Sequence, residues 1–513
     1  MRPKDKDPNQ QSRSSQRRLN ELKERLAHSS PEDLCPLPPL RRTSPVIETD
    51  LFPYGITGAW KHFPPVHDIP RVELLPIQRT TTAGSQPSHT LIIGGTGSGK
   101  TRRWIAPAST WWSGPVLITT TKTELPDILN SLGRDLIAPH ARKMIWSPVP
   151  TPIPKGWETI RWDPVLEVHD SFTATTVASD LVSLFGLSSS GAERFWEQQG
   201  SILLEPFLLV ASALHQDTAW VFQRLVAGPT EWKEVIDALD TIKAHQVAER
   251  LLGQMTAAAS DGGRRVDSAA ATAATAVAGW RNQSTTDELS PLNLHDWAYS
   301  NGDVLIVTVP TEYTSVFAPA VIALIDAAIR HAKTANEDFR RRQLPERHFG
   351  IFMDEMANLS PLPKLPTYLA ELRGHGITLI GALQHSTQFR RWGSLAETLT
   401  YSWPITLVHA RANEIDLAGR ISRAHGSHQV PKQSISKGPR QNLLGRNRTV
   451  STHLAWEPVL RPEEIFSGPT DAWSVLEGGL LTKKVMTLDS SHTAYQILLA
   501  QLPEDKVLQH RNH

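Results

Sequence analysis

The chain has 513 residues, of which 40% are hydrophobic, and its 53 basic and 52 acidic side chains leave a formal net charge of +1. This composition predicts a soluble globular protein of two or three domains with a large core. The single cysteine, Cys35, lies in a polar N-terminal segment, so a disulfide framework, a zinc cluster or thiol catalysis is not readily built within one chain, and a reducing cytoplasm fits best. Because the charge is balanced, any surface that binds DNA has to be a local one.

Residues 1–48 predict a mobile basic tail, since Arg17, Arg18, Arg41 and Arg42 lie among polar residues with few apolar groups. Such a tail either keeps the chain soluble or contacts nucleic acid or a membrane surface, and both roles stay open. Its polar start is unlike a signal peptide. No window approaches the roughly 18 consecutive apolar residues of a membrane span; the strongest candidate, 202–214, contains Glu205. We therefore expect a cytoplasmic chain.

Short strands are expected between Pro53 and Ser88, before the first strongly patterned element. This element is an apolar strand, Leu91–Ile93, followed by a glycine-rich loop. The loop residues are Gly94, Gly95, Thr96, Gly97, Ser98, Gly99, Lys100 and Thr101. Glycines let the backbone curl around phosphates at a helix N-terminus, the lysine reaches the β- and γ-phosphates, and the threonine hydroxyl ligates Mg²⁺. The pattern predicts a P-loop that binds ATP and Mg²⁺.

A second apolar strand, Val116–Ile118, follows the helix expected after the P-loop, which is the order of a parallel βαβ sheet. The next segments have the apolar spacing of helices, and they predict a helical insertion before the chain returns to the sheet at Val304–Val307. The expected helices cover residues 173–185, 193–214, 231–255 and 269–280.

The apolar run Phe349–Met353 ends in two acids, as a Walker B strand does. Asp354 is then placed to hold Mg²⁺, and Glu355 to take a proton from the attacking water. Two acids after a strand also commonly cap a helix, so the motif alone leaves both interpretations open. A further buried strand, Ile377–Leu383, ends at Gln384, whose amide either senses the γ-phosphate or bonds to the backbone.

Residues 412–452 are rich in Ser, Arg, Gln and Gly, and they predict a flexible loop. The apolar pieces after Trp456 predict strands that rejoin the nucleotide-binding domain.

From about His89 to Tyr495, the chain resembles the TraG/TraD family of coupling proteins of type IV secretion and conjugation systems. Besides the P-loop, the resemblance is carried by short motifs whose order and spacing are specific. These motifs are Lys122-Thr123-Glu124-Leu125, Trp162-Asp163-Pro164, Phe195-Trp196, Met353-Asp354-Glu355-Met356-Ala357, Leu372-Arg373-Gly374-His375-Gly376-Ile377 and Arg461-Pro462-Glu463-Glu464-Ile465.

The resemblance implies an α/β fold: a RecA-like P-loop NTPase domain with a mostly parallel sheet and an inserted all-α domain. It also implies that Arg373 is an arginine finger acting on a neighbouring subunit and that Gln384 is the γ-phosphate sensor. A solvent-exposed cation at a helix end is the alternative role for Arg373. The domains expected are a basic tail at 1–48, the first part of the nucleotide-binding domain at 49–186, the all-α insertion at 187–298, the second part at 299–497, and a C-terminal tail at 498–513.

The function implied is that of a hexameric, ATP-driven DNA translocase that delivers DNA, with its relaxase or an adaptor, to a type IV secretion channel. An FtsK-like DNA translocase is one alternative, and a platform that binds nucleotide without pumping is another. Family members usually show Asp-Pro-Lys-Gly-Glu where this chain has Thr120-Thr121-Lys122-Thr123-Glu124, so a substrate or subunit contact is expected to differ. Many members also begin with transmembrane helices; with a basic tail instead, this chain is expected to be recruited to the inner face of the membrane by a partner.

Overall fold

The computed structural model describes residues 56–59, 71–74, 88–112, 114–132, 138, 140–183, 191–261, 263–281, 289–437, 448–468, 472–487 and 489. The predicted tails at 1–48 and 498–513 lie outside these described residues.

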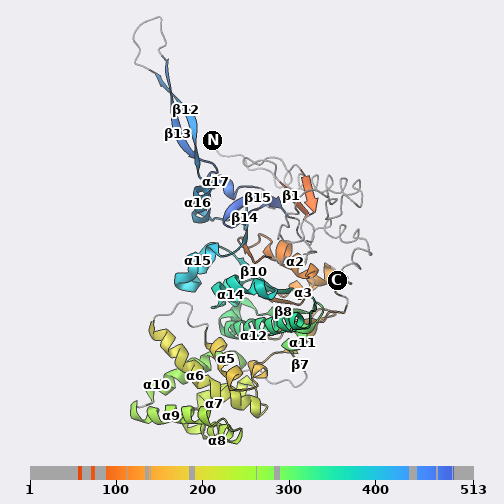
Figure 1. The fold of residues 1–513 in the computed structure, drawn as a ribbon, viewed down its shortest axis with the longest axis vertical. Coiled ribbons are helices and arrows are strands. Elements are labelled where there is room, and N and C mark those ends of the chain that lie inside the picture. The colour runs from red at the N-terminus through yellow and green to blue at the C-terminus, as the bar shows by residue number, and fades with distance from the viewer. Residues whose placement is uncertain are drawn as a thin grey trace.

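One large sheet forms the centre of the molecule (Figure 1). Its strands, in spatial order, are β15 (Leu480–Met486), β14 (Ala472–Glu477), β11 (Ile405–His409), β3 (Thr90–Ile93), β10 (Ile377–Leu383), β9 (Phe349–Met353), β4 (Val116–Thr120), β8 (Val304–Thr308), β5 (Lys143–Trp146), β6 (Glu158–Arg161) and β7 (Ser290–Pro291). Neighbouring strands from β11 to β7 are parallel, whereas β14 and β15 pair antiparallel at one edge. The prediction of an α/β fold with a mostly parallel sheet is confirmed, and the predicted C-terminal strands do rejoin the sheet.

Both faces of the sheet are buried, as the continuous apolar runs of its strands require. Leu91 and Ile93 of β3 belong to the core shared with helix α12 (Thr314–Arg341), while Ile92 between them packs with Trp104 on the opposite face. That opposite face is covered by the helical segment after the P-loop and by α3 (Leu125–Ser131). The strand ends are therefore fixed by two apolar layers.

Among the described residues, one helix, spanning Thr311–Arg341, is long and apolar enough to cross a membrane by length and composition. Residues 202–214 were thus the wrong choice for the strongest candidate. In the structure 72% of the helix's most apolar window is buried, which is also what the core helix of a domain shows.

The predicted helical insertion lies between β6 and β7 and gathers on the side of α12 away from the sheet (Figure 1). Its helices are α5 (Ser171–Val182), α6 (Gly191–Ala213), α7 (Thr218–Ala227), α8 (Lys233–Thr241), α9 (His245–Asp261) and α10 (Arg264–Val277). Two details of the prediction are wrong. The single helix expected at 231–255 is broken because Lys243 has a left-handed φ of 61°, and α7, capped by Asp217, was not predicted. The domain boundaries at 187 and 298 remain predictions.

The flexible loop predicted at 412–452 is also wrong for its described residues. They form α16 (Ile415–Ala424) and the long antiparallel pair β12 (Ser427–Lys437) and β13 (Arg448–Pro458), which projects from the body beyond β14 and β15 (Figure 1). Eleven residues of each strand pair with the other strand, so backbone N–H and C=O groups of the two strands bond to each other and not, as the polar composition had suggested, to water.

Shorter elements complete the described fold. They are β1 (Ile56–Ala59), β2 (Arg71–Leu74), η2 (Pro164–Glu167), η4 (Pro229–Glu231), η5 (Ala278–Trp280), α11 (Leu294–Tyr299), η6 (Thr311–Tyr313), α13 (Met356–Leu359), α14 (Leu365–Glu371), η7 (Leu372–His375), η8 (Ser386–Leu395), α15 (Ala396–Tyr401) and α17 (Pro462–Ile465).

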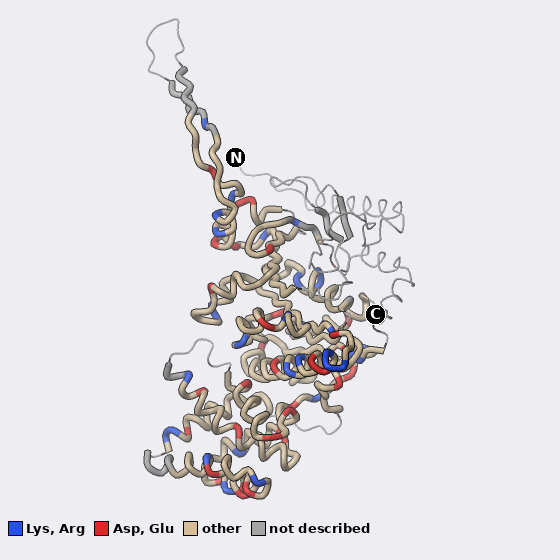
Figure 2. Tube along the Cα trace, viewed as in Figure 1, with Lys and Arg blue, Asp and Glu red and all other residues tan. Residues whose placement is uncertain are grey.

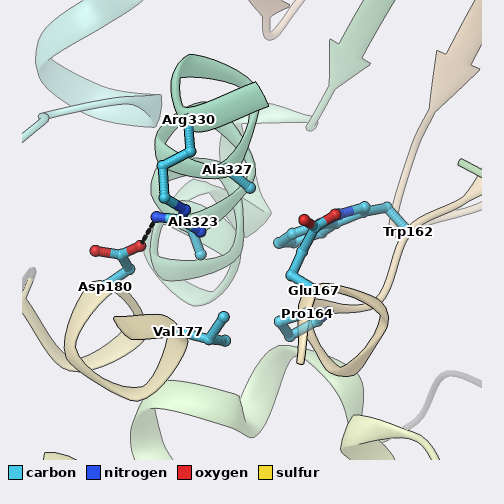
Figure 3. Close-up of a pocket in the computed structure, with 8 residues that line it drawn as sticks. All are labelled: Trp162, Pro164, Glu167, Val177, Asp180, Ala323, Ala327 and Arg330. Atoms are coloured by element: carbon cyan, nitrogen blue, oxygen red, sulfur yellow. Dashed lines mark hydrogen bonds and ion pairs between the residues drawn. The ribbon is translucent and has the colours of Figure 1, made fainter. Parts of the chain in front are cut away.

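A buried ionic cluster joins the helical insertion to the sheet domain. Lys364, just before α14, places Nζ 2.5 Å from Asp180 Oδ1 on α5 and 3.1 Å from Asp326 Oδ2 on α12. The hydroxyl of Tyr368 donates to Asp326 Oδ1 at 2.6 Å, and Arg330 pairs with Asp180 beside a narrow gap between the elements (Figure 3). The two buried carboxylates thus share one partly exposed lysine.

The pKa of Asp326 is raised to about 6 because burial and then the Asp180 carboxylate disfavour its ionised form. In the unfolded chain an aspartate titrates near about 3.9, so between about pH 4 and pH 6 only the folded chain keeps this proton. The stability contributed by protonated Asp326 is present below that window and is lost as the pH rises through it. We expect Asp326→Asn to remove this pH dependence of the free energy of unfolding. Between about pH 4 and pH 6 the parent should lose up to about 3 kcal/mol relative to the variant.

The measurement is urea unfolding of parent and variant at pH 4, 5 and 6.5. Asp237→Asn, at an exposed position of α8, is the charge-matched control. Parallel pH profiles of parent and Asp326→Asn would contradict the prediction.

Candidate nucleotide-binding site

The glycine-rich loop leaves the carboxyl end of β3 in the middle of the sheet. Gly97 and Gly99 have left-handed φ angles of 77° and 87°, conformations in which an L side chain is strained. A Cβ at Gly99 would also lie 2.6 Å from the Arg103 side chain. The loop is tied to the neighbouring strand where the Gly94 N–H donates to the Leu383 carbonyl at 3.1 Å. This is the turn that the sequence predicted for a P-loop.

The helix after the loop begins with a wide turn. Residues Thr101–Ile105 (η1) form a π-helix that continues directly into α2 (Ala106–Trp111), and the Ala106 N–H bonds to the Thr101 carbonyl. Pro107 has no N–H to make the usual bond one turn back, which accounts for the wide turn at this place. The turn leaves Thr101 buried at the start of the helix, directly after the loop.

The ammonium of Lys100 lies over the loop, where Nζ donates to the carbonyl oxygens of Gly94 at 2.6 Å and Gly95 at 3.2 Å. Lys100 is only 7% exposed. Burial lowers its pKa, and the nearby Glu355 and Asp354 carboxylates oppose that shift. Close by, the buried Ser98 Oγ has no hydrogen-bond partner among the described residues. A charged donor and an unsatisfied hydroxyl in one loop fit a phosphate group.

Asp354 directly follows β9 and lies beside this loop, and its side chain is the centre of a compact cluster of oxygen atoms. The Thr101 hydroxyl lies 2.8 Å from both carboxylate oxygens, although 253 residues separate the two positions in sequence. Thr120, at the end of β4, donates to Asp354 Oδ2 at 3.1 Å. Mg²⁺ prefers hard oxygen ligands and takes only one or two of them from a protein when a nucleotide supplies the rest. The predicted pair, Thr101 and Asp354, therefore fits this metal.

Glu355 follows immediately and is half-buried. Its pKa is raised by burial and then by the Asp354 carboxylate, while Lys100 and Lys122 oppose the shift. Asn358 Nδ2 donates weakly to Glu355 Oε2 at 3.4 Å. A carboxylate with a raised pKa beside a phosphate site has the property expected of a general base.

Gln384 also lies at the carboxyl ends of the strands, because it directly follows β10. The last residue of β10, Leu383, accepts the hydrogen bond from Gly94. The Gln384 N–H donates to Gln388 Oε1 at 2.7 Å, and the Gln384 side chain is exposed. The next turn is anchored where the Ser386 N–H donates to the buried Glu414 Oε1 at 2.7 Å. Gln384 is thus held next to the loop by residues after β10 and β11.

Arg373 lies on the opposite side of the sheet, at the amino-terminal ends of the strands. It precedes β10, whose Leu383 pairs with Ile93 in parallel register, so about 20 Å of strand separates it from the P-loop. The charge of Arg373 acts instead on His89, which directly precedes β3. The pKa of His89 is lowered to about 4 by burial and then by Arg373. Within one chain the structure does not bring Arg373 to the phosphate site.

Lys122 is a site residue that sequence reasoning missed. Its ammonium donates to Thr101 Oγ1 and lies 3.4 Å from Asp354 Oδ2. The sequence assigned the Thr120–Glu124 segment to a substrate or subunit contact, whereas Thr120 and Lys122 contact the predicted magnesium ligands. The signal was present, because the carboxyl end of the strand after a P-loop helix lies at the phosphate edge of a parallel sheet.

Other motifs of the resemblance hold the fold together. Asp163 accepts hydrogen bonds from the N–H groups of Val165 at 2.9 Å and Thr218 at 3.0 Å, which ties β6 to the start of α7. The Arg461 N–H donates to Glu464 Oε2 at 3.1 Å at the start of α17.

This fold and this site define a P-loop NTPase with a RecA-like α/β domain. Residues 77–485 match the model of the conjugative DNA transfer family of the type IV secretory system, and the chain belongs to that family. The resemblance to coupling proteins is therefore confirmed. No curated protein sequence matches this chain.

Solved structures of a bacterial conjugative coupling protein, TrwB, share the fold. The unbound monoclinic form is 16% identical, with a TM-score of 0.53 over 80% of this chain and 88% of that one. TrwB in complex with ADP and Mg²⁺ is also 16% identical, with a TM-score of 0.52 over 78% of this chain and 85% of that one. TrwB with a non-hydrolysable ATP analogue gives a TM-score of 0.53 at 16% identity over 79% and 86%.

Proposed function

We propose that this chain hydrolyses ATP with Mg²⁺ and uses the energy to move DNA into a type IV secretion channel. The observation that carries the proposal is the cluster of Lys100, Thr101 and Asp354 around a loop whose Ser98 hydroxyl has no hydrogen-bond partner in the described part of the chain. Support for ATP and Mg²⁺ comes from the TrwB complexes with ADP and Mg²⁺ and with an ATP analogue.

In this mechanism the residues of the loop, Gly94 to Thr101, cradle the phosphates, and Lys100 exchanges its backbone acceptors for phosphate oxygens. Thr101 and Asp354 would hold Mg²⁺, which when bound neutralises charge on the phosphates. Glu355 takes the proton of the attacking water, and Gln384 orients that water or contacts the γ-phosphate. Burial of Lys100, Thr101 and Asp354 strengthens the electrostatic interactions of these three side chains.

We further propose that six copies form a ring in which Arg373 completes the site of the neighbouring subunit. Support comes from the placement of Arg373 at the edge of the sheet opposite its own P-loop. The DNA contact is proposed to be largely independent of sequence, through phosphates in the central pore. Along the described trace of one chain, basic and acidic residues are interspersed (Figure 2), so the basic surface is expected from the assembled ring.

The partners proposed are a relaxase or adaptor bound to the DNA and a component of the secretion channel or membrane. The chain is proposed to act in the cytoplasm at the inner face of the membrane, recruited by such a component. Recovery of the purified chain in membranes without any partner would contradict this recruitment.

Two other functions suggested by the sequence are also to be distinguished by experiment. An FtsK-like translocase would also use a ring and ATP, but the long helical insertion between β6 and β7 favours the coupling protein. A platform that binds nucleotide without pumping would not need Glu355 beside the phosphate site.

The experiment is steady-state ATP hydrolysis with and without single- and double-stranded DNA, over protein concentrations that allow rings to form. We expect DNA to stimulate turnover, and Lys100→Ala to abolish it because the phosphates lose their cation. An unchanged rate in Lys100→Ala would overturn the assignment of the site.

A further inference from the structure

We infer that the Lys122 ammonium and a divalent cation compete for the same oxygens, Thr101 Oγ1 and Asp354 Oδ2, so that Lys122 swings away when the metal binds. This inference rests on the proposed magnesium site and adds a device that keeps the metal out until nucleotide arrives. It concerns the residues of this chain, whatever the ring transports.

The first step is the charge of Asp354, which is 1% exposed. A buried carboxylate is costly unless a cation or several donors compensate it. Thr101 and Thr120 supply neutral hydroxyl groups, and Lys100 donates to the backbone carbonyls of Gly94 and Gly95. Among the residues that the structure describes, the ammonium within salt-bridge distance of Asp354 is that of Lys122, at 3.4 Å.

The second step is the bonding capacity of Thr101 Oγ1. A hydroxyl has one donor and two acceptor positions. Its hydrogen is directed to Asp354, and it accepts a hydrogen bond from Lys122 Nζ. The second acceptor position stays open, but a magnesium ion there would lie about 2.1 Å from this oxygen and within a few ångströms of the ammonium that bonds to the same atom. Two cations so close repel strongly in a buried site, so one has to leave.

The third step is mobility. The side chain of Lys122 is 39% exposed, whereas that of Asp354 is fully enclosed. The backbone of Lys122 is fixed by its N–H bond to Thr120 Oγ1 at 3.1 Å, but its four-carbon stem is flexible. The lysine can therefore move while the ligands remain in place, ready for the metal that accompanies nucleotide.

The test measures Mn²⁺ binding to the protein without nucleotide, from the loss of the free-ion electron paramagnetic resonance signal. We expect Lys122→Met to bind one Mn²⁺ per chain at least about tenfold more tightly than the parent, a difference of about 1.4 kcal/mol. Lys122→Gln, which keeps a neutral donor, serves if the first variant does not fold, and is expected to change in the same direction. Lys233→Met, at the exposed start of α8, is the charge-matched control and should bind as the parent does.

Adding Asp354→Asn to Lys122→Met should abolish the gained site, which assigns it to this cluster. Equal affinity of parent and both folded Lys122 variants for Mn²⁺ would overturn the inference, as would gained binding that survives Asp354→Asn. A parallel titration with an ATP analogue separates the two proposals. If the parent binds Mn²⁺ with the analogue but the variants gain nothing without it, the competition alone fails; if none binds Mn²⁺ in either condition, the magnesium site of the proposed function fails as well.

Discussion

Glu355→Gln is expected to lower kcat for ATP hydrolysis by about 10²- to 10⁴-fold, the usual contribution of a positioned general base. The amide has the same shape but cannot take the proton of the attacking water. Nucleotide affinity should stay close to that of the parent, because the phosphates are held by Lys100 and the loop. Single-turnover hydrolysis and equilibrium binding of a fluorescent ATP analogue measure the two effects separately.

The pH dependence gives an independent readout of the same carboxylate. Burial and Asp354 raise the pKa of Glu355, so the base is lost on acidification at a higher pH than for an ordinary glutamate. The parent should therefore show an acid limb in kcat above the usual glutamate range, and Glu355→Gln should lack it. Glu397→Gln, an exposed site on α15, is the matched control. A variant at Glu355 that retained most of the parent rate would contradict the assignment.

Arg373→Ala is the second large effect, with an expected loss of hydrolysis on the order of 10³- to 10⁵-fold, as for other arginine fingers. The proposed finger acts between subunits, and this property can be tested. Arg373 lies at the edge of the sheet opposite its own loop, so Arg373→Ala subunits keep an intact loop, and Lys100→Ala subunits keep an intact finger. Neither variant alone should hydrolyse ATP, whereas a mixture should regain measurable DNA-stimulated turnover.

Arg342→Ala, at the exposed end of α12, is the control for loss of an arginine. Mixed with Lys100→Ala subunits, it should hydrolyse ATP as fast as the parent does in the same mixture. Mixtures that stay inactive although mixed rings form would show that Arg373 does not complete a neighbouring site.

Much of the central sheet could be predicted because its strands are short apolar runs that end in residues with chemistry. Leu91–Ile93 leads to the P-loop and Phe349–Met353 to Asp354, and both sets of expected side chains meet in the structure. The reason is physical: parallel strands end at one edge of a sheet, so motifs far apart in sequence converge there. Arg373 lies at the other edge for the same reason, because it precedes its strand rather than following it.

Local detail was less predictable. Lys243 breaks a continuous helical pattern through its own backbone conformation, which apolar spacing does not encode. The strands β12 and β13 project from the body (Figure 1), and large apolar side chains on β13, Leu454 and Trp456, are exposed, so their pairing left no pattern of a buried face in the sequence. Lys122 was missed because its segment was assigned to a substrate or subunit contact, although the end of β4 already placed it on the phosphate side of the sheet, where it lies 3.4 Å from Asp354 Oδ2.

The most direct test of the central claim is displacement of a third strand from a DNA triplex, followed as ATP is added to the parent and to Glu355→Gln. The proposed motor predicts ATP-dependent displacement by the parent, none with a non-hydrolysable analogue, and none by the variant. Hydrolysis by the parent without displacement, under conditions in which rings form on the DNA, would contradict translocation and favour the nucleotide-binding platform.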